Sequence, residues 1–227
     1  MLNISCIIPA YNEGKRVLAV INAVLRHENI DEVIVVNDGS SDDTEAVLKE
    51  VKGIELISYP KNGGKSHAIM MGFKKAKNDL VLMLDADLIG LDKESISALI
   101  KPVLNNEADI SLSLRSNSLG IYKLLGLDFI TGERCFNKNT IGDLNRLDKI
   151  PGFGLETFLN KIFIAQKTRI KVVNWKNVRM ARKSDKVGTV RGFIGDLKMI
   201  YEICTFFGWI NFVKIFFQMM SLKLDTN

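Results

Sequence analysis

Two carboxylates follow an apolar run in the stretch LVLMLDADLIGL, which spans residues 80–91. Asp85 and Asp87 are separated by one alanine, so in an extended chain their side chains point to the same face. Mg²⁺ and Mn²⁺ prefer oxygen ligands, take few of them from protein, and leave positions for phosphate oxygens and water. The pair therefore indicates a divalent metal site. The alternative role, capping of the helix that follows, is already filled by Asp92.

Three more polar clusters follow apolar runs: PAYNEG at 9–14, NDGSSDD at 37–43 and PKNGGK at 60–65. The apolar runs themselves predict buried strands at 3–9, 31–36, 54–59 and 79–84. Segments with the apolar spacing of helices separate them, at 14–28, 41–51, 63–78 and 92–104. This alternation, continued by a strand at 108–115, predicts an α/β fold with a mostly parallel sheet and helices on both faces.

The predicted sheet determines where the polar clusters lie. Right-handed crossovers place the carboxyl ends of parallel strands at one edge, where such sheets bind ligands. We therefore expect all four clusters to meet at that edge. Each cluster alone also fits an ordinary turn, because turns use Asn, Asp, Gly and Pro. Turns of the opposite edge, such as HENIDE and KAKND, lack this combination of glycine with carboxylate.

Composition limits the class of protein. The 227 residues are 47% hydrophobic and 25% charged, which is ordinary for a globular domain and argues against disorder. The net charge of +5 suits an anionic ligand or membrane surface, and equally a merely basic protein; we expect no nucleic-acid partner. Cys6, Cys135 and Cys204 form no CxxC pair, so neither a disulfide nor a zinc site is expected. The N-terminal residues read as a strand rather than a signal peptide, which predicts a cytoplasmic protein.

Four segments, CIIPAYNEGKRV, VIVVNDGSSDDT, NGGKSHAIMMGF and VLMLDADL, closely resemble the successive motifs of glycosyltransferase family 2. Members of this family use nucleotide sugars and have the GT-A fold, which is Rossmann-like. The resemblance covers about the first 115 residues and implies a UDP- or GDP-sugar donor with Mn²⁺ or Mg²⁺ at the DxD motif. Independently of the family, the two carboxylates can diverge where the chain bends at the end of the strand, so we expect Asp87 to be the direct metal ligand and Asp85 to be a ribose or water-mediated contact.

The same resemblance implies donor-binding roles for the other clusters. Glu13 is expected at the ribose, Asp38 at the base or ribose, and Lys65 at the diphosphate. Free backbone N–H groups before a helix would assist Lys65, although a solvated lysine is the alternative. The remaining donor-binding residues of these loops are Pro9, Ala10, Tyr11, Asn12, Gly63 and Gly64.

The second half resembles one subgroup in part. FITGERCF at 129–136 and GFGLETFL at 152–159 are similar to segments of enzymes like glucosyl-3-phosphoglycerate synthase, in which the glutamate matching Glu156 faces the sugar. An inverting enzyme needs a carboxylate base, and Glu156 and Glu133 are the catalytic candidates. That subgroup also carries a downstream metal-binding histidine. Met180 or Ala181 stands there in this chain, so phosphoglycerate as the acceptor does not follow from the resemblance.

Basic residues of the second half predict contacts to a phosphate or to the acceptor. An arginine fork grips a phosphate at two points, and a solvated basic loop is the alternative. The candidates are Arg134, Arg179, Arg182 and Lys183.

The C-terminal segment 203–220 carries a single charge, Lys214, and its 18 residues are at the lower limit for crossing a bilayer. Polar positions change face at Gly208, which predicts two amphipathic helices with broad apolar faces. They can meet a membrane surface, a second subunit or the domain itself. The membrane alternative predicts a peripheral position on the inner face of the membrane and a lipid-linked acceptor.

The expected organisation is a nucleotide-sugar-binding half at 1–115, an acceptor-side half at 116–190 and a helical appendage at 191–227. The expected function is metal-dependent transfer of a sugar from a nucleotide to an acceptor that is lipid-linked or phosphorylated. One alternative is a nucleotide-sugar-binding protein with lost or weak turnover. A nucleotidyltransferase is less suitable, because PAYNEGKRV is not the glycine- and arginine-rich loop that grips a triphosphate.

Overall fold

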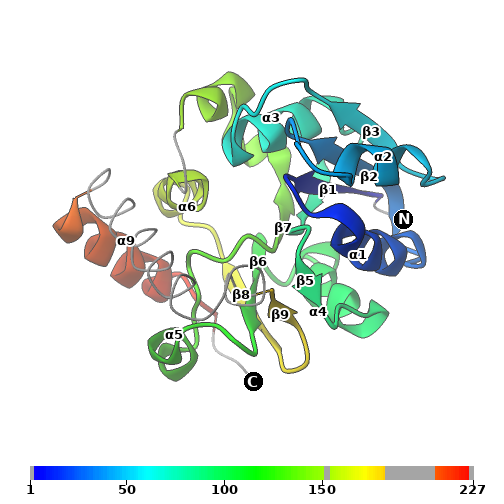
Figure 1. Ribbon diagram of the computed structural model, residues 1–227. Coiled ribbons are helices and arrows are strands. Elements are labelled where there is room, and N and C mark those ends of the chain that lie inside the picture. The colour runs from blue at the N-terminus through cyan, green and yellow to red at the C-terminus, as the bar shows by residue number, and fades with distance from the viewer. Residues whose placement is uncertain (1–2, 151–153, 182–207, 225–227) are drawn as a thin grey trace.

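A seven-stranded sheet forms the centre of the protein (Figure 1). The computed structural model describes residues 3–150, 154–181 and 208–224. The strand order is β3-β2-β1-β4-β7-β6-β8, and only β7 runs against its neighbours, so the prediction of a mostly parallel sheet is confirmed. The strands are β1 (Ile4–Ala10), β2 (Ile30–Asn37), β3 (Glu55–Ser58), β4 (Leu80–Met83), β6 (Ile110–Arg115), β7 (Arg134–Asn137) and β8 (Ile170–Trp175).

Helices cover both faces of the sheet, as expected for parallel strands that are apolar throughout. Successive strand residues alternate between two cores: Ile7 packs with α3, α6 and α9, whereas Cys6 and Ile8 pack with α1 and α4. The helices are α1 (Val17–Leu25), α2 (Thr44–Lys49), α3 (Lys65–Lys75), α4 (Lys93–Leu104), α5 (Gly120–Leu125), α6 (Leu155–Ala165) and α9 (Trp209–Ser221). The 3₁₀ helices of the described residues are η1 (Gly14–Arg16), η2 (Lys138–Ile141) and η3 (Leu144–Lys149).

Asp92 caps α4, as the sequence predicts, because its side chain accepts a hydrogen bond from the Ser95 N–H at 2.7 Å. Between Asp87 and this cap, β5 (Leu88–Ile89) forms a small antiparallel ribbon with β9 (Arg179–Met180). The ribbon brings residues on either side of the expected boundary at 115 together. The central sheet does the same, since β7 and β8 belong to the second half and pair with β4 and β6.

Helix α9 lies against α6, on the face of the sheet that α6 covers. Ile215 and Met219 are buried there, and the chain after α9 adds a bridge to β8 through Ile170. The first of the two predicted C-terminal helices falls in 182–207, outside the described residues. None of the helices in the described part of the chain is both long enough and apolar enough to span a bilayer.

Candidate functional site

The loop after β1 is fastened to the loop after β2. The Asn12 N–H donates to Ser40 Oγ at 3.0 Å, and the N–H groups of Glu13 and Gly14 donate to Thr44 Oγ1 at 2.9 and 2.7 Å. The two loops therefore form one unit at the carboxyl edge, as predicted for parallel strands. Of the other donor-binding candidates in this loop, Pro9 is half-buried, Ala10 is buried and Tyr11 is 47% exposed.

Asp38 ties the loop after β2 to the start of α3. Its two carboxylate oxygens accept from the N–H groups of Gly63 and Gly64, each at 2.8 Å. Next to it Gly39 has a φ of +65°, and a Cβ there would lie 2.5 Å from the backbone of residues 61–62. Only glycine fits this close approach. The expectation that these N–H groups are free for a diphosphate is wrong in this structure, because the carboxylate of Asp38 already accepts both.

Lys65, the first residue of α3, is ion-paired with the loop after β4 and with α6. Its Nζ lies 2.7 Å from Asp85 Oδ1 and 2.8 Å from Glu156 Oε1. Glu156 belongs to the first turn of α6. Burial by itself would lower the pKa of Lys65, but the charges of Asp85 and Glu156 raise it above its usual range. Burial also opposes the charge of Asp85, yet Lys65 keeps the pKa of this carboxyl below 3.8. Lys65 and Asp85 are therefore both ionised at neutral pH.

Gly132 makes room for the carboxylate of Asp85. A Cβ at this position would lie 2.5 Å from Asp85 Oδ2 and 2.6 Å from Oδ1. Gly132 is buried just before β7, so the segment that leads into the antiparallel strand packs directly against the DxD motif. Contact between the two predicted halves of the chain thus fixes where Asp85 lies.

Asp87 is half-buried at the start of the β5–β9 ribbon, and its carbonyl accepts from the Ala181 N–H at 2.9 Å. Met180 and Ala181, which replace the expected histidine, therefore lie beside Asp87. Asn117 holds them there: its side chain donates to the Met180 carbonyl at 2.9 Å and accepts from the Met180 N–H at 3.1 Å.

The side chains at this edge fit a hard divalent cation. Asp85 and Asp87 supply carboxylate oxygens, while the side chains of Met180 and Ala181 offer neither oxygen nor nitrogen. Among the described residues, no group of three or more His, Cys, Asp and Glu side chains gathers into a metal site. An oxygen-only and incomplete set of protein ligands suits Mg²⁺ or Mn²⁺ that binds together with a diphosphate.

Behind Asp85 lies a buried network of charges. Arg115, at the end of β6, donates to Glu133 Oε1 at 3.1 Å and faces Asp128 Oδ2 at 3.5 Å. Burial disfavours the arginine charge, but Glu133, Asp128 and Asp85 raise the pKa of Arg115 above its usual range. Glu133 is 0% exposed, and its other oxygen accepts from Ser113 at 2.7 Å. The network therefore places the Glu133 carboxylate inside the protein rather than at the open edge.

The predicted acceptor-binding arginines lie in different surroundings. Arg134 is 0% exposed, and its guanidinium donates to the carbonyls of Thr131 and Phe129 and to Asn160. This burial contradicts its expected role as a phosphate or acceptor contact. Arg179 is exposed in β9. The other two candidates, Arg182 and Lys183, lie outside the described residues.

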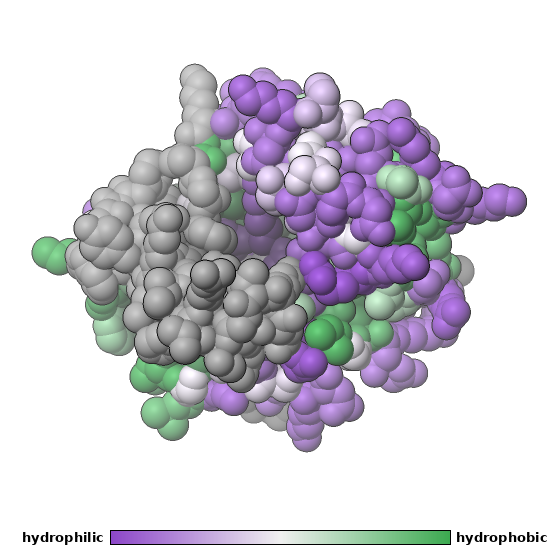
Figure 2. Space-filling view, viewed as in Figure 1, coloured by the Kyte–Doolittle hydropathy of each residue, from purple (hydrophilic) through white to green (hydrophobic). Residues whose placement is uncertain are grey.

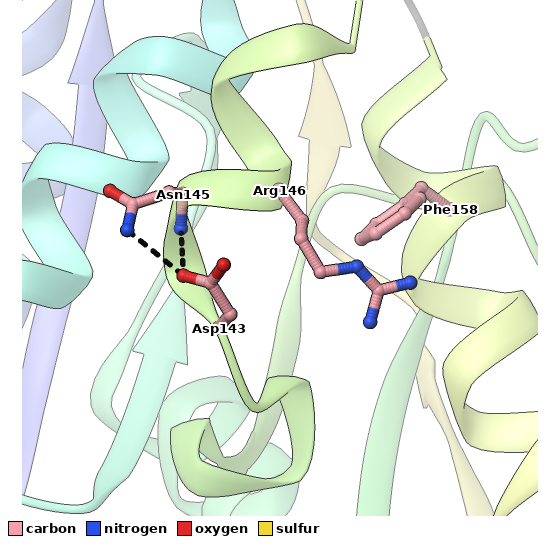
Figure 3. Close-up of a pocket in the computed structure, with 4 residues that line it drawn as sticks. All are labelled: Asp143, Asn145, Arg146 and Phe158. Carbon is pink, nitrogen blue, oxygen red and sulfur yellow. Dashed lines mark hydrogen bonds between the residues drawn. The ribbon is translucent and has the colours of Figure 1, made fainter.

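A cavity of about 300 Å³ opens between η3 and α6, lined by Asp143, Asn145, Arg146 and Phe158 (Figure 3). The Arg146 guanidinium lies 5.2 Å from the centre of the Phe158 ring. None of the predicted site residues lines this cavity. Hydrophilic side chains instead cover the loops around β1, β2 and α3 in the space-filling view (Figure 2).

Three residues of the site were missed in the sequence: Gly132, Arg115 and Asn117. Gly132 stands in TGER next to a glutamate that is buried, and Arg115 lies at the end of a buried strand, as Asp85 does shortly after β4. A polar residue directly after a buried strand was therefore the available signal for Arg115. Asn117 carried no signal, because its role depends on a ribbon partner more than sixty residues away.

Comparison with known proteins agrees with this geometry. Residues 5–153 match the model of glycosyl transferase family 2. The UDP-N-acetylglucosamine–dolichyl-phosphate N-acetylglucosaminyltransferase of Methanococcus voltae is 27% identical over 207 residues, which cover 73% of this chain and 81% of that protein. A dolichyl-phosphate beta-glucosyltransferase of Trichomonas vaginalis is 30% identical over 54% of this chain, which spans only 44% of that relative's length.

Among solved structures, glucosyl-3-phosphoglycerate synthase from Mycobacterium tuberculosis, in complex with Mn²⁺, UDP and glucosyl-3-phosphoglycerate, superposes with a TM-score of 0.64. It is 25% identical, and the match covers 82% of this chain and 75% of that one. The fold is therefore the GT-A fold, and the family match spans well over half of the chain. The chain belongs to glycosyl transferase family 2.

Proposed function

We propose that this protein is a glycosyltransferase that moves a sugar from a nucleoside diphosphate sugar, with a UDP-sugar favoured, to an acceptor. The observation that carries the proposal is the Lys65 amine held between Asp85 and Glu156. It joins the start of α3, the DxD motif and α6 at one edge of the sheet. A nucleotide sugar has groups for all three: a diphosphate, a sugar, and phosphate oxygens that complete a metal shell.

The donor is oriented by residues of the first half. The fastened loops after β1 and β2 hold the nucleoside, with the exposed Tyr11 at their surface and the Glu13 carboxylate, which is only 12% exposed, paired with Arg16 at 3.0 Å. Lys65 and the first turn of α3 face the diphosphate. Ser66, in that turn, is 3% exposed and its hydroxyl has no hydrogen-bond partner within the described residues. Buried hydroxyls are normally paired, so a phosphate oxygen is a suitable partner.

Asp87 and Asp85 are the residues that would hold Mn²⁺ or Mg²⁺. When bound, the cation offsets the negative charge that builds up on the departing diphosphate. Lys65 contributes positive charge at the same place from the protein itself. When the donor arrives, Lys65 exchanges part of its contact with Asp85 for the diphosphate.

Glu156 is our candidate for the sugar and acceptor side. The acceptor oxygen forms a bond to the sugar carbon while the bond from that carbon to the diphosphate breaks. If the acceptor is a hydroxyl, its proton goes to a carboxylate base, and Glu156 is better placed than the enclosed Glu133. If the acceptor is a phosphate, as the names of the dolichyl-phosphate relatives suggest, no proton has to be removed. Glu156 then holds Lys65 and the sugar.

We favour a lipid-linked phosphate as the acceptor, used at the cytoplasmic face of a membrane. Two of the relatives are named for transfer to dolichyl phosphate, and the exposed apolar residues of α9 suit a lipid surface. Phosphoglycerate is disfavoured, because Arg134 is buried and the histidine of that subgroup is replaced.

Release of nucleoside diphosphate from a panel of UDP- and GDP-sugars with Mn²⁺, with and without a polyprenyl phosphate, tests the proposal. Asp87→Ala should abolish metal-dependent donor binding, measured by calorimetry, and leave the fold intact. Asp79→Ala, an exposed aspartate at the opposite end of β4, is the matched control and should bind as wild type. Wild-type donor affinity in Asp87→Ala would refute the metal assignment.

The second candidate function, a nucleotide-sugar-binding protein with lost turnover, is favoured by the replaced histidine. The same panel separates the two functions. Calorimetric donor binding without release of diphosphate for any donor and acceptor pair would favour the binding protein.

A further inference from the structure

Two helices carry exposed apolar side chains that nothing in the described structure covers. On α5, Ile121 is 54% and Leu124 81% exposed. On α9, Ile210 is 85%, Val213 49% and Phe217 65% exposed. Large side chains with such exposed fractions protrude from the surface. We call these five residues the α5–α9 patch.

The two helices are neighbours because both pack on Phe129. The Phe129 ring lies 5.7 Å from the ring of Tyr122 in α5, and 4.9 and 5.4 Å from those of Phe212 and Phe216 in α9. The buried stripe of α9 that contains Ile215 packs on the domain, so the exposed stripe faces away from it. The patch is therefore an additional apolar face and not a displaced part of the core.

Within α5 and α9 themselves, the charged side chains are all positive. Lys123 on α5 and Lys214 on α9 are exposed, and neither helix contains an aspartate or a glutamate. Apolar side chains that protrude among lysines are typical of proteins that bind anionic lipid surfaces. A contact between two copies would instead bring these lysines toward each other.

The patch is linked to the donor edge of the sheet. Strand β6 runs parallel to β4, so it ends at the edge that carries Asp85, and α5 begins five residues after Arg115. Phe129, on which both helices pack, precedes Gly132 by three residues, and Gly132 touches Asp85. The patch is therefore connected to the donor edge through the end of β6 and through the segment 129–132.

We propose that the α5–α9 patch docks on an anionic lipid bilayer, with the protruding apolar side chains inserted among the acyl chains and the lysines at the headgroups. This inference rests on the proposed function in one respect, since docking would present a lipid-linked acceptor to the donor edge. The docking itself does not depend on turnover.

The test is sedimentation of the full chain with vesicles of phosphatidylcholine alone and with added phosphatidylglycerol. Wild-type protein should bind the anionic vesicles more tightly, and salt should weaken this binding only in part. Leu124→Asp with Phe217→Asp should lower the partition coefficient by on the order of tenfold or more for each apolar side chain lost from the lipid. Leu25→Asp, a partly exposed leucine on α1, is the matched control and should bind as wild type.

Melting temperature and calorimetric UDP binding with Mn²⁺, measured on every variant, show that the fold and donor site persist. Loss of vesicle binding with retained donor binding supports the docking. Donor binding that fails in wild type while vesicles still bind refutes the proposed function and leaves the docking standing. A wild-type dimer that ignores vesicles, and that the double variant splits into monomers in analytical ultracentrifugation, overturns the proposal in favour of a second copy. A monomer that ignores both kinds of vesicle overturns it as well.

Discussion

Replacement of Gly132 by alanine should displace the carboxylate of Asp85, although no charged residue is itself substituted. The added Cβ would lie 2.5 Å from Asp85 Oδ2 and 2.7 Å from its Cγ, and contacts below 3.0 Å are essentially never seen. Gly132 is buried, and the Asp85 side chain is only 16% exposed and ion-paired with Lys65. The carboxylate must therefore move away from the glycine at the expense of its 2.7 Å contact with Lys65.

The size of the effect follows from this displacement. A misplacement of about 1 Å in a reacting site can lower a rate about a hundredfold. We expect Gly132→Ala to lower kcat/KM for the nucleotide sugar by roughly 30- to 100-fold, which corresponds to about 2–3 kcal/mol of transition-state stabilisation. The free energy of unfolding should fall by about 1–3 kcal/mol, as for other overpacked sites.

Initial rates of nucleoside diphosphate release and calorimetric binding of UDP with Mn²⁺ measure the first effect, and urea unfolding measures the second. Gly120→Ala is the control, because no atom lies within 4 Å of its added Cβ. It opens α5 and should leave turnover unchanged while stabilising the helix by about 0.5–1 kcal/mol. If Gly132→Ala binds the donor and turns over like wild type, the contact with Asp85 does not set the geometry of the site.

Glu156→Gln keeps the shape but removes the charge that faces Lys65, so turnover should fall by roughly 100-fold or more with little change in UDP affinity; near wild-type turnover would exclude Glu156 as base or sugar contact. Asn117→Ala removes both hydrogen bonds that hold Met180, so Mn²⁺-dependent UDP affinity should fall by about tenfold, measured by calorimetry, whereas an unchanged affinity would show that the ribbon is placed without this clamp. His27 is 2% exposed and burial lowers its pKa from 6.5. The unfolded chain therefore binds a proton more readily, and stability should decline as the pH falls through 6.5. His27→Gln should flatten that decline in melting temperature between pH 7.5 and 5.5. An unchanged slope of melting temperature against pH would show that His27 does not cause the decline.

The first half of the chain could be predicted from the sequence because its signals are local. Strands that are apolar throughout, such as β4, end at residues like Asp85, and both the strand and its end are visible within ten residues. Parallel strands then have only one way to place their carboxyl ends, so the convergence of the loops around Asp38, Lys65 and Asp85 follows from the topology. Asp92 as a helix cap is determined in the same way.

The sequence could not show the roles of side chains that depend on distant partners. Glu133 and Arg134 read as site residues, yet the antiparallel β7 turns them into the interior, where Arg115 and Asn160 pair with them. Strand β7 runs antiparallel to both of its neighbours, and its four residues contain no sequence signal for that direction. The hydrogen bond from the Gly63 N–H to the Asp38 carboxylate likewise joins residues that are 25 positions apart in the sequence.

The sequence by itself therefore determined the class of fold, the edge of the sheet and the residue types collected there, because hydrophobic period and turn chemistry act over a few residues. Only the tertiary structure decided which of those residues face each other: Lys65 between Asp85 and Glu156, Gly132 under Asp85, and the α5–α9 patch beside Phe129. These contacts join elements far apart in the chain. Their geometry is set by packing of the whole core, to which each local segment contributes only a part.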